Sequence, residues 1–168
     1  TNGIKYITSK PGLDQQLKVE HIELQPETKK ELNERFCLIY KGQRRLARNL
    51  LRDVVGRYVG NEPDSLYALN EIQKVAALMR FELERGKIDE FASLLNYHWE
   101  LSRKVDAGST NTLIDQIFLS IEDLIDAKMV CGAGGGGFLQ VILKKGVQKT
   151  DVHKRLKDVF QDNPVDVW

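Results

Sequence analysis

The sequence predicts an α+β fold in which a small, mostly antiparallel sheet is covered by helices. Short strand-like segments occur near both ends of the chain, four amphipathic helical patterns occupy its centre, and its last part alternates strand, helix and strand. At 168 residues the chain has the length of one domain, which buries about two thirds of its unfolded surface. No internal repeat or low-complexity linker divides it, so we expect a single domain, 1–168.

The N-terminal quarter of the chain reads as strands separated by turn signals. Ile4–Thr8 predicts a short strand, and Pro11-Gly12 marks the turn after it. Residues 17–24 alternate imperfectly between apolar and polar and predict a second strand. The polar segment 26–34 suits a helical turn, and the apolar run Phe36–Tyr40 has the length of a strand in the middle of a sheet.

The centre of the chain predicts four helices, because its apolar residues recur every three and four positions. Pro63 suits the first turn of the second helix, where its missing N–H does no harm, and Ser109 or Thr110 can cap the fourth. The helices are expected over residues 43–58, 63–85, 88–105 and 111–126.

After these helices the pattern returns to strands. Phe138–Lys144 predicts a buried strand, and Thr150 or Asp151 can cap a last helix that ends before Asn163-Pro164. Val165–Trp168 predicts a short final strand at the end of the chain.

A glycine-rich loop lies between the fourth helix and the strand that follows it. Five of the six residues 132–137 are glycine, which permits positive φ angles and close approach of another group to the main chain. A dinucleotide fingerprint needs a strand before the loop and a helix after it, whereas the predicted order is reversed. A P-loop needs Lys and Ser/Thr where Phe138 and Leu139 stand. Any phosphate contact must therefore come from backbone N–H groups or from a partner loop, against the negative end of the preceding helix.

Composition narrows the function classes. Lys and Arg total 25 against 24 Asp and Glu, so the net charge of +1 provides no field that would attract nucleic acid or an anionic membrane. Cys37 and Cys131 lie far apart without metal-ligand spacing, which suits reduced thiols in a cytoplasmic protein. No apolar run approaches the length of a membrane span, and no signal peptide opens the chain. The start at Thr1 suggests a piece of a longer polypeptide.

The segment Cys131–Phe138 resembles the third signature motif of the GHMP kinases, a glycine-rich loop followed by a strand in the C-terminal half of a two-domain enzyme. The segment Tyr40–Ala47 is similar to the turn with Thr-Gly-x-x-Arg-x-Ala in the branch that makes sugar 1-phosphates. Residues 12–16 and the pair His98-Trp99 followed by Leu101-Ser102 point within that family to the L-fucose kinases first and the heptose kinases second. The likeness spans nearly the whole chain, whose last strand-helix-strand unit resembles half of a ferredoxin-like fold.

The resemblance implies a phosphotransferase that passes the γ-phosphoryl group of ATP to the anomeric hydroxyl of L-fucose, on the route to GDP-fucose. It assigns the glycine loop to the nucleotide and sugar cleft and places Arg44, Arg45 and Ser109 on the sugar side. The loop residues concerned are Gly132, Ala133, Gly134, Gly135, Gly136 and Gly137. In some relatives the kinase is fused to a guanylyltransferase.

The family's serine- and glycine-rich ATP loop and its N-terminal catalytic residues have no counterpart in this sequence. The chain therefore resembles only the substrate-side, C-terminal half of the enzyme. ATP and Mg²⁺ would be held mainly by an N-terminal kinase domain of the same polypeptide, and we expect the 168-residue chain to be inactive by itself.

Other candidate residues have simpler structural explanations. Arg44, Arg48 and Arg52 recur every four residues and suit a solvated helix face, although Arg44 and Arg45 also sit at a helix start that favours anions. His98 has no carboxylate or metal partner spaced to orient it as a base. Asp106 and Asp115 suit surface carboxylates, and metal ligation finds no support.

Two functions from different classes therefore remain. The first is half of a sugar 1-kinase, with fucose before heptose as the substrate. The second is a non-enzymatic ferredoxin-like module that binds an effector or a partner through the same glycine loop. A nucleotide loop upstream of Thr1 would distinguish the first from the second.

Overall fold

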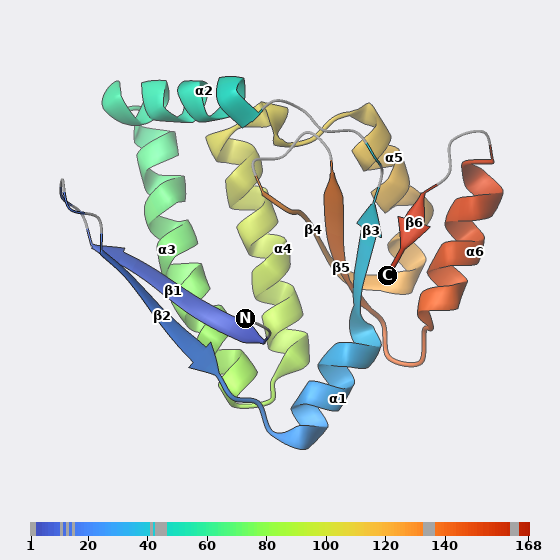
Figure 1. Ribbon diagram of the computed structural model, residues 1–168. Coiled ribbons are helices and arrows are strands. Elements are labelled where there is room, and N and C mark those ends of the chain that lie inside the picture. The colour runs from blue at the N-terminus through green and yellow to red at the C-terminus, as the bar shows by residue number, and fades with distance from the viewer. Residues whose placement is uncertain are drawn as a thin grey trace.

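The computed structural model describes residues 3–10, 12, 14, 16–40, 42, 47–132, 137–161 and 165–168, with only the backbone described for 47–51, 53 and 107. It places six strands in two separate antiparallel sheets, with helices on both faces of the larger one (Figure 1). The predicted α+β class, with small antiparallel sheets covered by helices, is confirmed.

The smaller sheet is the N-terminal hairpin of β1 (Ile4–Lys10) and β2 (Gln16–Ile22). A ten-residue helix, α1 (Pro26–Arg35), follows it, where the sequence predicted a single helical turn within 26–34. Pro26 opens this helix, since the first helical position has no N–H bond to lose. β3 (Phe36–Tyr40) follows at once and has the predicted bounds.

The larger sheet has the strand order β4-β5-β3-β6, and every pair in it is antiparallel. β4 (Ile125–Val130) forms one edge and pairs with β5 (Phe138–Leu143). β6 (Asp166–Val167) pairs with the end of β3 at the opposite edge. This sheet carries the glycine loop at one of its ends, between β4 and β5.

The prediction of a helix over 111–126 is wrong in its second half. α5 (Thr112–Ser120) is capped by the Asn111 side chain, which accepts from Ile114 N at 3.0 Å, and a 3₁₀ turn over Glu122–Leu124 leads into β4. Leu124 and Ile125 continue the helical period of α5, whereas the side chains of Ile125–Val130 alternate as in a strand. Backbone pairing with β5 makes this segment a strand. The glycine loop therefore follows a strand, and the negative helix end expected before it is absent.

The long helices match the predictions more closely. α2 (Ala47–Val59), α3 (Pro63–Glu84) and α4 (Ile88–Val105) occupy the centre of the chain, and α4 has the predicted bounds. α6 (Lys149–Val159) begins earlier than expected, with Gln148 as its N-cap and Asp151 completing a capping box.

Side chains from β5 divide the core into two layers. Leu139, Val141 and Leu143 point into the cluster formed with α5 and α6, whereas Ile142 packs toward α4 on the other face. This alternation is the consequence of the period of two along a strand. α3 packs on the outer side of α4 and extends that second layer (Figure 1).

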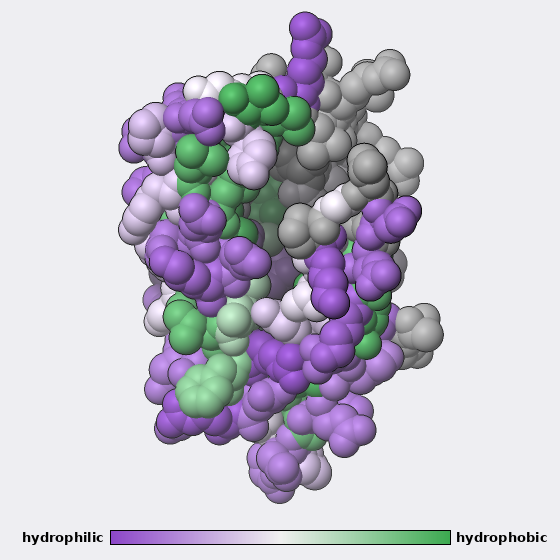
Figure 2. All heavy atoms as spheres, turned by 90° about the vertical axis from the view of Figure 1, so that its left-hand side faces the viewer, coloured by the Kyte–Doolittle hydropathy of each residue, from purple (hydrophilic) through white to green (hydrophobic). Residues whose placement is uncertain are grey.

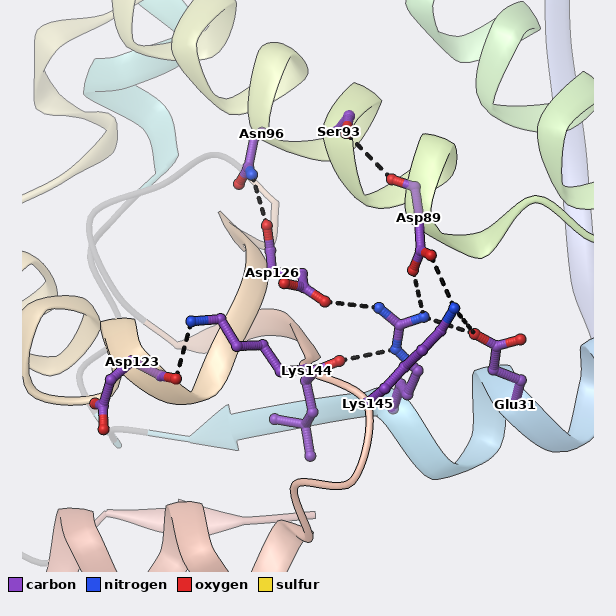
Figure 3. Close-up of polar contacts among 10 residues, drawn as sticks. Glu31, Asp89, Ser93, Asn96, Asp123, Asp126, Lys144 and Lys145 are labelled. Carbon is purple, nitrogen blue, oxygen red and sulfur yellow. Dashed lines mark hydrogen bonds and ion pairs between the residues drawn. The ribbon is translucent and has the colours of Figure 1, made fainter.

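Two polar contacts fix α4 and α1 against the sheet (Figure 3). Asn96 of α4 donates to Asp126 O at 2.8 Å and accepts from Lys128 N at 3.0 Å, so its amide binds the open edge of β4. At the end of α1, the buried Arg35 guanidinium donates to Leu143 O and to carboxylates of three elements. These carboxylates belong to Glu31, Asp89 and Asp126.

Candidate functional site

The glycine loop is built as the connection of an antiparallel strand pair. Cys131 N donates to Phe138 O at 2.9 Å, which extends the β4–β5 ladder up to the loop. Gly132 and Gly137 then adopt φ angles of +76° and +90°, a region that L side chains rarely enter. Ala133, Gly134, Gly135 and Gly136 lie outside the described residues.

Space around the two described loop glycines is open. Among the described residues, a Cβ atom added at Gly132 or at Gly137 would meet no atom within 4 Å. Tight packing against a neighbouring element therefore does not explain glycine at these two positions. Their backbone conformation does, and it leaves the main chain accessible on both sides of the loop.

The segment after β3 lies beside the glycine loop. Tyr40 is the register partner of Phe138, and their rings are 4.7 Å apart with an interplanar angle of 36°. Gly42, two residues after Tyr40, also has a positive φ of +75°. The structure thus brings the described ends of the two motif segments, Tyr40 and Phe138, to the same end of the sheet. Arg44 and Arg45 lie outside the described residues.

The turn that contains Ser109 lies at the same end of the molecule. Arg35 binds Asp89 in the first turn of α4 and Asp126 near the start of β4, so the two elements start together. Asn96, two turns along α4, accepts from Lys128 N further along β4, so α4 and β4 run in the same direction. The C-terminal end of α4 and the 3₁₀ turn Ala107–Ser109 therefore lie toward the end of the sheet at which β4 finishes (Figure 1).

Ser109 and Asp106 carry buried oxygen atoms without hydrogen-bond partners. Ser109 is 6% exposed, and neither its Oγ nor Asp106 Oδ2 has a partner. The other carboxylate oxygen of Asp106 accepts from Gly108 N at 3.0 Å. An unsatisfied buried polar group costs about 1–3 kcal/mol, so this turn holds hydrogen-bonding capacity that the described residues do not use.

His98 is held by its own helix. Its Nδ1 lies 3.3 Å from Ser102 Oγ, which donates to the His98 carbonyl at 2.9 Å. Burial lowers the pKa of His98, which keeps the ring neutral near pH 7. Within the described part of the chain no carboxylate contacts it, and sequence reasoning had likewise preferred a structural histidine.

Neither cysteine is activated. Cys37 lies in the core, and burial raises the pKa of its thiol to about 11. Burial also raises the pKa of Cys131, whose Sγ is 3.9 Å from Gln140 Oε1. A nucleophilic cysteine needs a lowered thiol pKa, so both behave as small packing residues.

Across the described ranges, no three or more His, Cys, Asp or Glu side chains are grouped closely enough to hold a metal ion. In the same part of the chain, no helix combines the length and the apolar composition needed to cross a membrane.

No family model matches the chain, but curated proteins do. It is 28% identical over 156 residues to a bifunctional fucokinase/GDP-fucose pyrophosphorylase from Arabidopsis thaliana. It is 27% identical over 156 residues to an L-fucokinase/L-fucose-1-P guanylyltransferase from Bacteroides fragilis. Each match covers 93% of this chain, which spans only about 15% of the length of these relatives.

Solved structures of kinases share the fold. A mevalonate kinase from L. major matches with a TM-score of 0.76 over 96% of this chain and 47% of its own, at 15% identity. A galactokinase from Lactococcus lactis matches with a TM-score of 0.59 over 91% of this chain and 47% of its own, at 12% identity. The chain is therefore similar in sequence to a part of these fucokinases and has the fold of about half of these kinase structures.

This finding confirms the recognition made from the glycine motif, including its extent over nearly the whole chain. The resemblance by itself did not say how the two motifs lie relative to each other, and the structure pairs Tyr40 of one with Phe138 of the other. Sequence reasoning missed the buried Asp106 Oδ2, which has no partner among the described residues, because a carboxylate after a helix gives no signal that separates it from a surface residue.

Proposed function

We propose that this chain is the substrate-side, C-terminal half of an ATP-dependent sugar kinase that phosphorylates the anomeric hydroxyl of L-fucose. The observation that carries the proposal is the sequence similarity to two fucokinases, one from a plant and one from a bacterium, over 93% of the chain. The structural matches support a kinase fold but span mevalonate, galactose and heptose kinases, so the choice of fucose rests on the sequence relatives.

The glycine loop would act in phosphoryl transfer through its backbone. That reaction requires in-line positioning of the reactants and neutralisation of charge on the transferred group, with little covalent chemistry from the protein. Consecutive N–H groups in a loop with positive φ angles can form an anion-binding concavity, and Gly132 and Gly137 have such angles at its two ends. A strand precedes the loop, so no helix C-terminus opposes a bound anion there.

The sugar would lie between the glycine loop and the neighbouring turns. We assign the predicted contacts Arg44, Arg45 and Ser109 to this side, with Arg44 and Arg45 as donors to hydroxyl or phosphate oxygens. Ser109 Oγ is unpartnered but faces inward, so its contribution requires a shift of its turn when the sugar binds.

The nucleotide and Mg²⁺ would be held mainly by an N-terminal kinase domain of the same polypeptide. When bound, ATP and Mg²⁺ supply the phosphoryl group and neutralise its charge, while the residues of this chain position the acceptor. Calorimetry on the 168-residue chain should accordingly show no tight ATP binding, and micromolar affinity would place the nucleotide site in this half.

A matched pair of glycine variants tests the role of the loop. Gly137 and Gly146 precede and follow the same strand, have φ angles of +90° and +88°, and both leave open space for a Cβ atom. Alanine at either position therefore carries the same backbone strain, about 1–2 kcal/mol. In the full-length kinase, Gly137→Ala should lower kcat/KM by about tenfold or more, whereas Gly146→Ala should lower only stability. Equal activities would assign the loop to structure alone.

A substrate screen decides between the candidate sugars and the non-enzymatic alternative. The full-length protein would be given ATP, Mg²⁺ and one sugar at a time, with ADP release as the measurement. L-Fucose should give the highest kcat/KM. Preference for a heptose would select the heptose 1-kinase, a candidate supported by the fold match at a TM-score of 0.54 to a D-glycero-D-manno-heptose 1-phosphate kinase. Absence of ADP release with all sugars would favour a ferredoxin-like binding module.

A further inference from the structure

The hairpin of β1 and β2 stands apart from the larger sheet. Its strands pair only with each other among the described residues, over seven register pairs from Ile4↔Ile22 to Lys10↔Gln16. An isolated two-stranded hairpin is at best marginally stable in water, so it needs support on its faces. Figure 1 shows it lying across α3, away from the four-stranded sheet.

One face of the hairpin is supported by α3. The register partners Tyr6 and Glu20 both contact Arg80, whose guanidinium lies 4.9 Å from the centre of the Tyr6 ring and 3.4 Å from a Glu20 oxygen. Ile22 is buried, and Ile4 packs against the α4 side of the core. Residues of this parity along the two strands therefore form the inner face.

The opposite face carries exposed apolar side chains. Ile7 and Val19 are register partners of the other parity, and Leu17 is the next residue of that face on β2. Their exposed fractions are 58%, 49% and 63%. The solvent-facing side of a hairpin normally carries polar residues. Three large apolar side chains together on one face therefore indicate a surface that another group covers.

The apolar surface continues into a groove between the hairpin and α3. A cavity of ≈ 450 Å³ is present there, and Ile7 lines it as well as the outer face. Its other apolar walls include Phe36, Met79 and Leu83. On the face shown in Figure 2, hydrophobic side chains gather in and beside a central hollow bordered by hydrophilic ones.

The occupant must be large and apolar, because the exposed side chains lie on an open face as well as inside the groove. The kinases that share the fold are longer than this chain, and their remaining part is a candidate for such an occupant. This chain matches only 47% of the mevalonate kinase from L. major and 43% of that from Methanococcus jannaschii, so more than half of such a fold lies outside it.

We propose that the outer face of the hairpin, formed by Ile7, Leu17 and Val19, is the docking surface for the remaining, nucleotide-binding part of the kinase polypeptide. The inference rests on the proposed function, because it takes the partner to be the other half of that enzyme. The hairpin would then connect the two halves, with its inner face on α3 and its outer face under apolar side chains of the partner half. Burial of three such side chains stabilises the contact without any charge pairing.

Cysteine labelling of the full-length kinase tests the docking surface. Val19→Cys replaces an exposed side chain by a smaller one, and Leu119→Cys and Val159→Cys provide controls at 70% and 53% exposure in this chain. Each variant reacts with a maleimide under native conditions, and peptide mass spectrometry separates the new thiol from Cys37 and Cys131. Val19→Cys should react at least about tenfold more slowly than both controls, and equally fast in urea. Leu17→Cys should behave in the same way if Val19→Cys fails to fold.

The proposed docking surface is contradicted if Val19→Cys and Leu17→Cys react as fast as the controls. It is also contradicted if their protection depends on protein concentration, because that dependence identifies a second copy of the chain as the occupant. Labelling needs no substrate, so a failed sugar screen with a protected hairpin would overturn the proposed sugar and leave the docking surface standing. An active sugar kinase whose hairpin cysteines react as fast as the controls would support the proposed function and overturn the docking surface.

Discussion

Replacing Arg35 by methionine should destabilise the chain more than any single surface change. Arg35 is 4% exposed, and its guanidinium donates to Leu143 O at 2.8 Å and to carboxylates of Glu31 and Asp89 at 2.6 and 2.7 Å. A fourth bond of 2.8 Å reaches Asp126 on β4. The residue thereby joins α1, α4, β4 and the end of β5 at one point (Figure 3).

The magnitude follows from what each partner loses. The Leu143 carbonyl is buried and would be left without its side-chain donor, at about 1–3 kcal/mol. The three carboxylates are partly exposed and can be rehydrated, so each lost ion pair adds at most about 1 kcal/mol. Together these allow a cost of up to about 6 kcal/mol, and we expect about 3–5 kcal/mol for Arg35→Met, the range for breaking a buried ion pair. With a urea m-value of about 2 kcal/mol/M, the unfolding midpoint should fall by about 1.5–2.5 M.

Arg155→Met is the matched control for this experiment. Arg155 also binds a carboxylate and a carbonyl, those of Asp123 and Ser120, with bonds of 2.9 to 3.0 Å. Its side chain is 41% exposed, so the control should cost no more than about 1 kcal/mol. Urea unfolding followed by circular dichroism measures both variants. A midpoint shift for Arg35→Met no larger than that of the control would refute the anchoring role of the buried guanidinium.

Asn96→Ala removes both bonds to the edge of β4 and should cost about 1–3 kcal/mol, which lowers the melting temperature by several degrees in calorimetry. An unchanged melting temperature would show that the edge strand does not need this amide. Hydrogen bonds from Lys145 and Arg35 lower the pKa of Asp89 below its ordinary value of 3.8. Its contribution to stability is therefore present above that value and is lost as the pH falls through the lower folded-state pKa. The urea midpoint of Asp89→Asn should therefore fall less than that of the parent chain between about pH 5 and pH 2, and parallel curves would exclude this linkage.

Elements with a strong local signal were predicted closely. The apolar run Phe36–Tyr40 and the pattern of α4 over Ile88–Val105 have the bounds expected from sequence, because their periodicity agrees with where they are buried. β4 was missed because Leu124 and Ile125 extend the period of α5, and only pairing with β5 shows that the chain has left the helix. The candidate site was predicted in part, since the glycine loop and the segment after β3 were recognised as motifs without their contact being known.

The sequence by itself determined the fold class and the kinase resemblance, because hydrophobic period and a dense glycine run are properties of neighbouring residues. Only the tertiary structure showed that Tyr40 and Phe138 join two motifs at one end of a sheet and that Arg35 gathers carboxylates from three elements. It alone showed which face of the hairpin leaves Ile7 and Val19 in solvent. These features depend on strand register and on packing between segments distant in the chain, which no local pattern encodes.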